Sequence, residues 1–190
     1  MTTLLGRIES SPKRNPRMRA PVRMLVFLAA SAVGALAAAA PGVGEIESFH
    51  AVTDRVAIGA QPTPEQVIAL ANAGFNGIIT LREESELNDG PQSHAAVTSG
   101  VQFFRIPVSR ENPSDAAVEK FLMVTDDENV YPLFIYCASG NRAAALWMIR
   151  RVLRDRWTVS DAEAEAARVG LTSATMRDFA RDYIRRHPAH

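Results

Sequence analysis

The stretch PLFIYCASGNRAAALW, residues 132–147, gives the strongest indication of the fold in this chain of 190 residues. It begins with a continuous apolar run, which is typical of a central strand covered on both faces. Cys137, the only cysteine of the chain, and Arg142 follow, and the sequence then continues in a helical pattern. A strand, a short loop and a helix in this order place the loop at the carboxyl end of a parallel strand, where ligands collect in α/β sheets.

The same alternation of strand and helix patterns continues on both sides of this stretch. Thr63 and Ser114 stand where they can cap helices. Further strands are predicted at 55–60, 77–81 and 101–108, and helices at 63–74, 91–100, 112–124, about 160–169 and 173–186. Strands separated by helices of about a dozen residues favour βαβ units. The sequence therefore predicts an α/β fold with a mainly parallel central sheet of about four to five strands, flanked by helices.

Residues 137–142 combine a nucleophile with a predicted anion-binding loop. The backbone N–H groups that are expected to form this cradle belong to Ala138, Ser139, Gly140, Asn141 and Arg142. The start of a helix favours an anion, and such settings lower the pKa of cysteine thiols from about 8.5 to roughly 3.5–7.5. Gly140 permits a backbone conformation that a side chain would block, and Arg142 offers a planar fork of donors. A buried structural thiol would explain Cys137 but not its glycine and arginine neighbours.

The loop resembles the active loops of cysteine-dependent phosphatases and of rhodaneses. Four residues separate Cys137 from Arg142, whereas the usual tyrosine phosphatase loop has five, so the spacing alone favours a rhodanese. The upstream sequence is similar to the beta-lactamase-hydrolase-like, phosphatase-like family, which has the tyrosine and dual-specificity phosphatase fold. The matching features are GAQP at 59–62, LRE at 81–83, IPV at 106–108 and the loop itself. The resemblance covers about residues 50–155, and 160–172 also look like exported members of the family.

The resemblance implies a thiol phosphatase mechanism, in which Cys137 attacks phosphorus while Arg142 and the loop N–H groups hold the phosphate oxygens. It places the general acid on the loop after residue 108, where Glu111 is the first candidate and Asp115 the second. Gln61, Arg82 and Asp115 are candidates for the pocket rim. Arg82 is expected either to bind an acidic substrate or to pair with a neighbouring glutamate.

Two residues depart from the family pattern. Ala138 stands where relatives often have arginine, and Ala143 stands where a hydroxyl would often assist release of the thiolate. Two alternatives therefore remain beside the phosphatase. One is a rhodanese-type sulfurtransferase that carries a persulfide on Cys137, and the other is a non-catalytic module that binds an anion.

The N-terminal region reads as a targeting segment. Basic residues precede the apolar run at 24–40, which predicts a signal peptide cleaved near residue 40 and an exported protein, periplasmic or extracellular. The alternative is a membrane anchor formed by residues 24–40. After residues 1–40, the sequence predicts a linker at 41–50, a phosphatase-like domain at 51–158 and a helical extension at 159–190 that packs on it.

Charge and composition restrict the partners. Of 21 basic and 21 acidic residues, six basic and one acidic lie in residues 1–40, which leaves 15 basic and 20 acidic residues for the rest. This balance gives no reason to expect nucleic-acid binding. A single cysteine excludes an internal disulfide, and neither a metal nor a cofactor is expected. The expected partner is a phosphorylated small molecule or a phosphoprotein.

Overall fold

Strand β5 (Leu133–Tyr136) lies at the centre of a five-stranded sheet with the order β1-β2-β5-β3-β4. The computed structural model describes residues 40–86 and 89–188. Strands β2 (Val56–Gly59), β3 (Gly77–Thr80) and β4 (Gln102–Arg105) run parallel to β5, and the short β1 (His50–Ala51) pairs antiparallel with β2 at one edge. The predicted mainly parallel sheet is thus confirmed.

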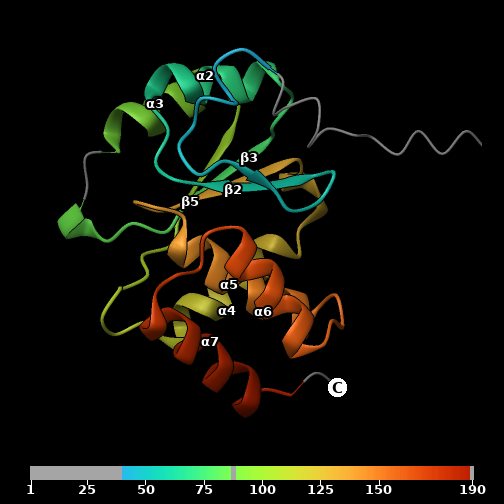
Figure 1. Cartoon of the computed structure of the whole chain (residues 1–190). Coiled ribbons are helices and arrows are strands. Elements are labelled where there is room, and N and C mark those ends of the chain that lie inside the picture. The colour runs from blue at the N-terminus through green and yellow to red at the C-terminus, as the bar shows by residue number, and fades with distance from the viewer. Residues whose placement is uncertain (1–39, 87–88, 189–190) are drawn as a thin grey trace, which may run out of the picture.

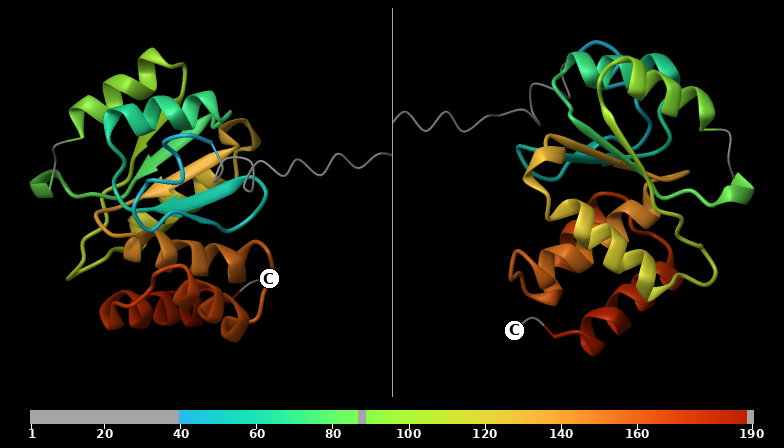
Figure 2. Two further views of the ribbon diagram at one scale, coloured as in Figure 1. Left: turned by 45° about the horizontal axis from the view of Figure 1, so that its top comes forward. Right: turned by 180° about the vertical axis from the view of Figure 1, so that it is seen from behind.

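Helices cover both faces of the sheet (Figures 1 and 2). Helices α2 (Pro64–Asn72) and α3 (Gly90–Thr98) lie on one face. The other face carries α4 (Asp115–Thr125), α5 (Asn141–Leu153), α6 (Val159–Arg168) and α7 (Ala174–Arg186). Thr63 and Ser114 cap α2 and α4 as predicted, because each side chain accepts a hydrogen bond from a backbone N–H three residues later. Two 3₁₀ turns, η1 (Glu84–Glu86) and η2 (Glu128–Val130), complete the described elements.

The apolar character of β5 follows from this layering. Leu133 and Ile135 pack with α4 to α7, whereas Phe134 and Tyr136 pack with α2 and α3. Because successive side chains of a strand point to opposite faces, a strand covered on both faces needs an apolar residue at every position. All four side chains are fully buried.

The register of the sheet brings four loops to one edge. Tyr136 is aligned with Gly59 of β2 and with Thr80 of β3, and Thr80 is in turn aligned with Arg105 of β4. The residues after β2, β3, β4 and β5 therefore leave the sheet at the same level. Cys137 is the first residue after β5 at this edge.

The segment predicted as a linker, residues 41–50, is instead packed against the sheet. Val43 and Ile46 are buried in the core on the α2 side, and the carbonyl of Glu47 accepts a hydrogen bond from the N–H of Ala60. The prediction was wrong because this segment is built from turns, which leave no periodic apolar pattern. Residues 1–39, which contain all but the last residue of the predicted signal or anchor segment, lie outside the described residues.

Within residues 40–86 and 89–188, no helix has the length and apolar character needed to cross a membrane.

Candidate active site

The loop after β5 turns its backbone around the sulfur of Cys137. The N–H of Gly140 donates a hydrogen bond to Cys137 Sγ over 3.1 Å, and Cys137 is 1 % exposed. Gly140 precedes α5 with a φ of 87°, in the left-handed region that glycine adopts without strain. A Cβ there would meet only ordinary contacts, so backbone conformation rather than space requires the glycine. Ala138 and Ser139 are exposed, and the sulfur therefore lies at the floor of a loop whose rim faces solvent.

Arg142 joins three loops at the sheet edge. Its Nη1 donates to the carbonyls of Leu81, after β3, and Val108, after β4, over 3.2 and 2.9 Å. Nη1 and Nη2 also bind the two carboxylate oxygens of Glu86 over 2.6 and 2.9 Å. The side chain is 1 % exposed, so the guanidinium is held in one orientation by buried contacts.

One edge of this guanidinium remains free. The Nε of Arg142 is buried and has no hydrogen-bond partner among the described residues. A guanidinium carries five N–H donors, and each Nη bears two, so the second Nη2 donor also remains. Burial disfavours the charge of Arg142, but Glu86 and the sulfur of Cys137 outweigh it and raise the pKa of the guanidinium. The Nε–Nη2 edge is therefore a permanently charged fork in the neighbourhood of Cys137.

Glu86 is a site residue that the sequence did not single out. Its carboxylate, with 10 % of the side chain exposed, also accepts from the N–H of Glu83 over 2.9 Å and faces Arg110 Nη2 at 3.2 Å. The hydrogen bonds from Arg142 are the main cause that lowers the pKa of Glu86 to about 2. Because the pKa is depressed on folding, the stabilisation from this pair is complete above the ordinary glutamate range and is lost as the pH falls toward 2.

Arg82 supports the same turn from the other side. Its guanidinium donates to the side-chain oxygen of Gln61 and to the backbone carbonyl of Glu86. Of the two expectations for Arg82, no ion pair with a neighbouring glutamate is present among the described residues, because the carbonyl rather than the carboxylate of Glu86 faces the guanidinium. Binding of an acidic substrate by Arg82 stays a prediction. Gln61 and Arg82 thus link the loops after β2 and β3 to the turn that holds Arg142.

The two candidates for the general acid occupy different places. Glu111 is exposed on the loop after β4, where its nearest polar contact is Ser109 Oγ at 3.5 Å, and its neighbour Arg110 ties this loop to Glu86. Asp115 begins α4 and forms a two-pronged ion pair with Arg186 of α7, at 2.5 and 2.8 Å. No hydrogen bond or ion pair of the described residues joins Asp115 to the loop 137–142.

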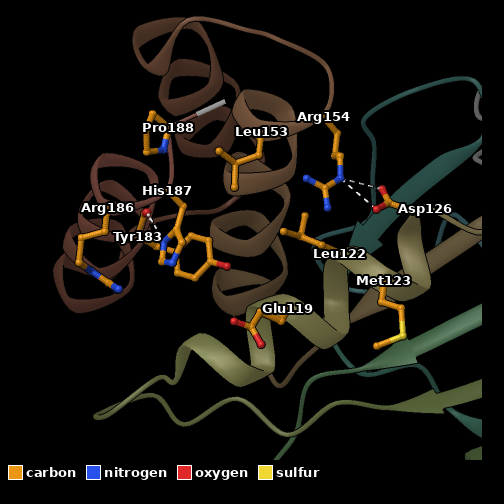
Figure 3. Close-up of a pocket in the computed structure, with 10 residues that line it drawn as sticks. All are labelled: Glu119, Leu122, Met123, Asp126, Leu153, Arg154, Tyr183, Arg186, His187 and Pro188. Carbon is orange, nitrogen blue, oxygen red and sulfur yellow. Dashed lines mark hydrogen bonds and ion pairs between the residues drawn. The ribbon is translucent and has the colours of Figure 1, made fainter. Parts of the chain in front are cut away.

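A separate hollow of about 870 Å³ lies between α4, α5 and α7 (Figure 3). Figure 3 shows Leu122 and Met123 on one side and Tyr183 and His187 on the other, with Arg154 paired to Asp126 at one end. None of its lining residues belongs to the loop 137–142. The hollow is therefore distinct from the candidate active site.

Comparison with known sequences agrees with the resemblance predicted above. The profile of the family described as "DSP-PTPase phosphatase fused to NAD+ Kinase" matches residues 42–182. A beta-lactamase hydrolase-like protein of Xylella fastidiosa is 29 % identical over 120 residues, which are 60 % of this chain and 27 % of that protein. The matched part thus spans about a quarter of the curated relative's length. The predicted resemblance is confirmed.

Solved structures support the fold. The core catalytic domain of the PP-IP phosphatase SIW14 of S. cerevisiae, in complex with citrate, is 19 % identical with a TM-score of 0.63, over 72 % of this chain and 85 % of that chain. A cysteine-to-serine variant of TpbA of P. aeruginosa, in complex with pTyr, is 17 % identical with a TM-score of 0.58, over 75 % and 84 % of the two chains. At such identities the likeness establishes an α/β fold of the tyrosine phosphatase type.

Proposed function

Because the chain belongs to the family described as DSP-PTPase phosphatase fused to NAD+ kinase, we propose that it hydrolyses a phosphate monoester through a phosphocysteine intermediate on Cys137. The observation that carries this proposal is the buried Nε of Arg142, which has no hydrogen-bond partner among the described residues, near a sulfur that accepts the N–H of Gly140. Two parallel donors match two oxygens of a phosphate. The other donors of Arg142 are used to fix its orientation, as an anion-binding arginine requires.

The proposed reaction has two steps. The thiolate of Cys137 attacks phosphorus, an S–P bond forms, and the ester P–O bond breaks as the leaving oxygen takes a proton. Water then attacks the phosphocysteine, breaks the S–P bond and releases inorganic phosphate and the thiolate. Arg142 and the N-terminal amides of α5 stabilise the charge on the phosphate oxygens in both steps, and such preorganised donors supply a large part of catalysis.

For the substrate we propose a phosphotyrosyl protein or a small phosphorylated molecule. This follows the chemistry named for the structural relatives, one a PP-IP phosphatase and one bound to phosphotyrosine. The family match favours phosphate chemistry over sulfur transfer, although the four-residue loop fits both. Release of phosphate from para-nitrophenyl phosphate, without persulfide on Cys137 after incubation with thiosulfate, would support the phosphatase. A persulfide on Cys137 after incubation with thiosulfate, without release of phosphate from para-nitrophenyl phosphate, would support the sulfurtransferase.

One observation favours the second candidate, a module that binds an anion without catalysis. Ala143 follows Arg142 and is fully buried, so it supplies no hydroxyl to the departing thiolate. Ser139 is the nearest hydroxyl along the loop, and the structure pairs its backbone with Ala60. Tight binding of phosphate without turnover of any aryl phosphate would favour the binding module over the enzyme.

The role of Glu111 is tested by the leaving group. If Glu111 protonates the leaving oxygen, the Glu111→Gln variant should lose about 100-fold in kcat on an alkyl phosphate, whose alkoxide needs a proton. The loss on para-nitrophenyl phosphate should be much smaller, because nitrophenolate leaves without one. Steady-state kinetics on both substrates measures the contrast. Asp115→Asn is the matched control and should affect neither substrate; equal losses on both substrates for Glu111→Gln would exclude Glu111 as the acid.

A further inference from the structure

The side chain of Asn141 is directed away from the anion cradle, toward the connection between α6 and α7. Its Oδ1 accepts hydrogen bonds from the backbone N–H groups of Thr172 and Ser173, both over 2.8 Å, and contacts Thr172 Oγ1 at 3.3 Å. The side-chain oxygen of Asn141 is therefore used by the α6–α7 connection. One carboxamide oxygen joins the first residue of α5 to a segment 31 and 32 residues away in sequence.

The helical pair α6–α7 is held against α5 at the opposite end as well. Arg151 forms a buried, two-pronged ion pair with Glu165, at 2.8 Å on both sides. Between the two ends, small and apolar side chains of α6 and α7 are buried against α5: Ala162, Ala166, Met176 and Ala180. These contacts hold α6 and α7 against α5, and the hydrogen bonds of Asn141 tie the start of α5 to the connection between them.

The start of α5 is where the candidate active site takes its geometry. Asn141 lies between Gly140, whose N–H binds Cys137 Sγ, and Arg142, whose guanidinium faces the same site. Gly140 is in a left-handed conformation with no side-chain cap at this helix start. The carbonyl of Gly140 accepts a hydrogen bond from the N–H of Ala144 over 2.9 Å, but glycine has no side chain that could hold the residue in place. The hydrogen bonds to Asn141 Oδ1 provide the side-chain anchor at the next residue.

We propose that Asn141 is a positioning residue whose carboxamide, held by the α6–α7 connection, keeps the N–H of Gly140 directed at Cys137 Sγ. The helices α6 and α7 then help to fix the geometry of the loop 137–142. The consequence for turnover depends on the proposed phosphatase function, but the consequence for the reactivity of the thiol does not. A misplacement of about 1 Å at a reacting centre can cost about 100-fold in rate.

The test compares two single substitutions in the full chain. Asn141→Ala removes the link, whereas Ser173→Ala keeps the backbone N–H that binds Asn141 and removes only the side-chain cap of α7, which accepts from the N–H of Met176 over 3.3 Å. Both variants should lower the melting temperature modestly, since each removes a hydrogen-bond acceptor at the start of α7. Only Asn141→Ala should change the rate at which iodoacetamide alkylates Cys137, with a loss of about tenfold under the same conditions.

If the wild-type protein has phosphatase activity, its kinetic constants give a second test of the role of Asn141. Asn141→Ala should lower kcat for para-nitrophenyl phosphate by about tenfold or more with little change in KM, while Ser173→Ala keeps both constants. If Asn141→Ala keeps the wild-type rate of alkylation, the role of Asn141 is only structural and the proposal is overturned. A wild-type protein without phosphatase activity would contradict the proposed function alone, because the alkylation rates would still decide the role of Asn141.

Discussion

Replacement of Cys137 by serine is expected to lower the rate of para-nitrophenyl phosphate hydrolysis by about 10⁴-fold or more, which is the scale of loss when an enzyme's nucleophile is removed. A serine hydroxyl has the same shape as the thiol, but it stays protonated in a site that provides no base for it. The N–H of Gly140 can still donate to the hydroxyl oxygen, so the loop keeps its hydrogen bond. The measurement is steady-state turnover of both proteins under the same conditions.

The control for this experiment is retained binding. Arg142 and its three loops are untouched by Cys137→Ser, so the variant should bind inorganic phosphate or vanadate with an affinity close to that of the wild type. It should also keep its melting temperature approximately, because the buried hydroxyl can still accept the hydrogen bond from the N–H of Gly140. If the variant loses both turnover and phosphate binding, the substitution has disordered the loop. If turnover survives the substitution, the result contradicts a thiolate mechanism.

The second large effect is expected for Glu86→Gln. Glutamine keeps one acceptor oxygen but presents an amide N–H₂ to a guanidinium nitrogen, and it leaves the charge of Arg142 buried without its partner. Removal of one member of a buried ion pair costs about 3–5 kcal/mol. We therefore expect a clear fall in the free energy of unfolding, together with a loss of about 100-fold in kcat/KM because Arg142 is no longer fixed. Denaturant unfolding and steady-state kinetics measure the two effects.

The same 3₁₀ turn provides the matched control. Glu84 carries the same charge two residues away, but its side chain is 76 % exposed and lies 3.8 Å from Arg105. An exposed pair of this kind contributes about 0–1 kcal/mol, so Glu84→Gln should leave stability and turnover close to those of the wild type. If Glu86→Gln behaves like Glu84→Gln, Arg142 does not depend on Glu86 and the arrangement described here is wrong.

The sequence was sufficient to predict those strands and helix starts that depend on neighbouring residues alone. The continuous apolar run of β5 predicts a strand covered on both faces, and the caps Thr63 and Ser114 mark helix starts that the structure shows. Local patterns overestimate the length of strands, however. The segment 101–108 was predicted as one strand, but only Gln102–Arg105 pairs with β3. The N–H groups of Ile106 and Val108 still donate to the carbonyls of Thr80 and Leu81, but the regular ladder has ended, and the carbonyl of Val108 accepts from Arg142.

The candidate site could be predicted only in part, because sequence patterns show neighbouring residues but not contacts between distant segments. Cys137, Gly140 and Arg142 lie in one loop, and their residue types indicate their chemistry without knowledge of the fold. Glu86 could not be separated from its neighbours Glu83 and Glu84, since all three lie on one charged turn and only the fold selects the one that meets Arg142. Contacts of this kind span 56 residues of sequence, and no local pattern records them.

The central claim is that Cys137 carries the phosphoryl group during turnover. Wild-type protein is mixed with an excess of an aryl phosphate, quenched in acid within the first turnovers, digested and examined by mass spectrometry. The account predicts one added phosphoryl group on the peptide that contains Cys137, and none on the corresponding peptide of Cys137→Ser. Phosphate release without this adduct, or an added sulfur atom on Cys137 after thiosulfate in a protein that releases no phosphate, would contradict it.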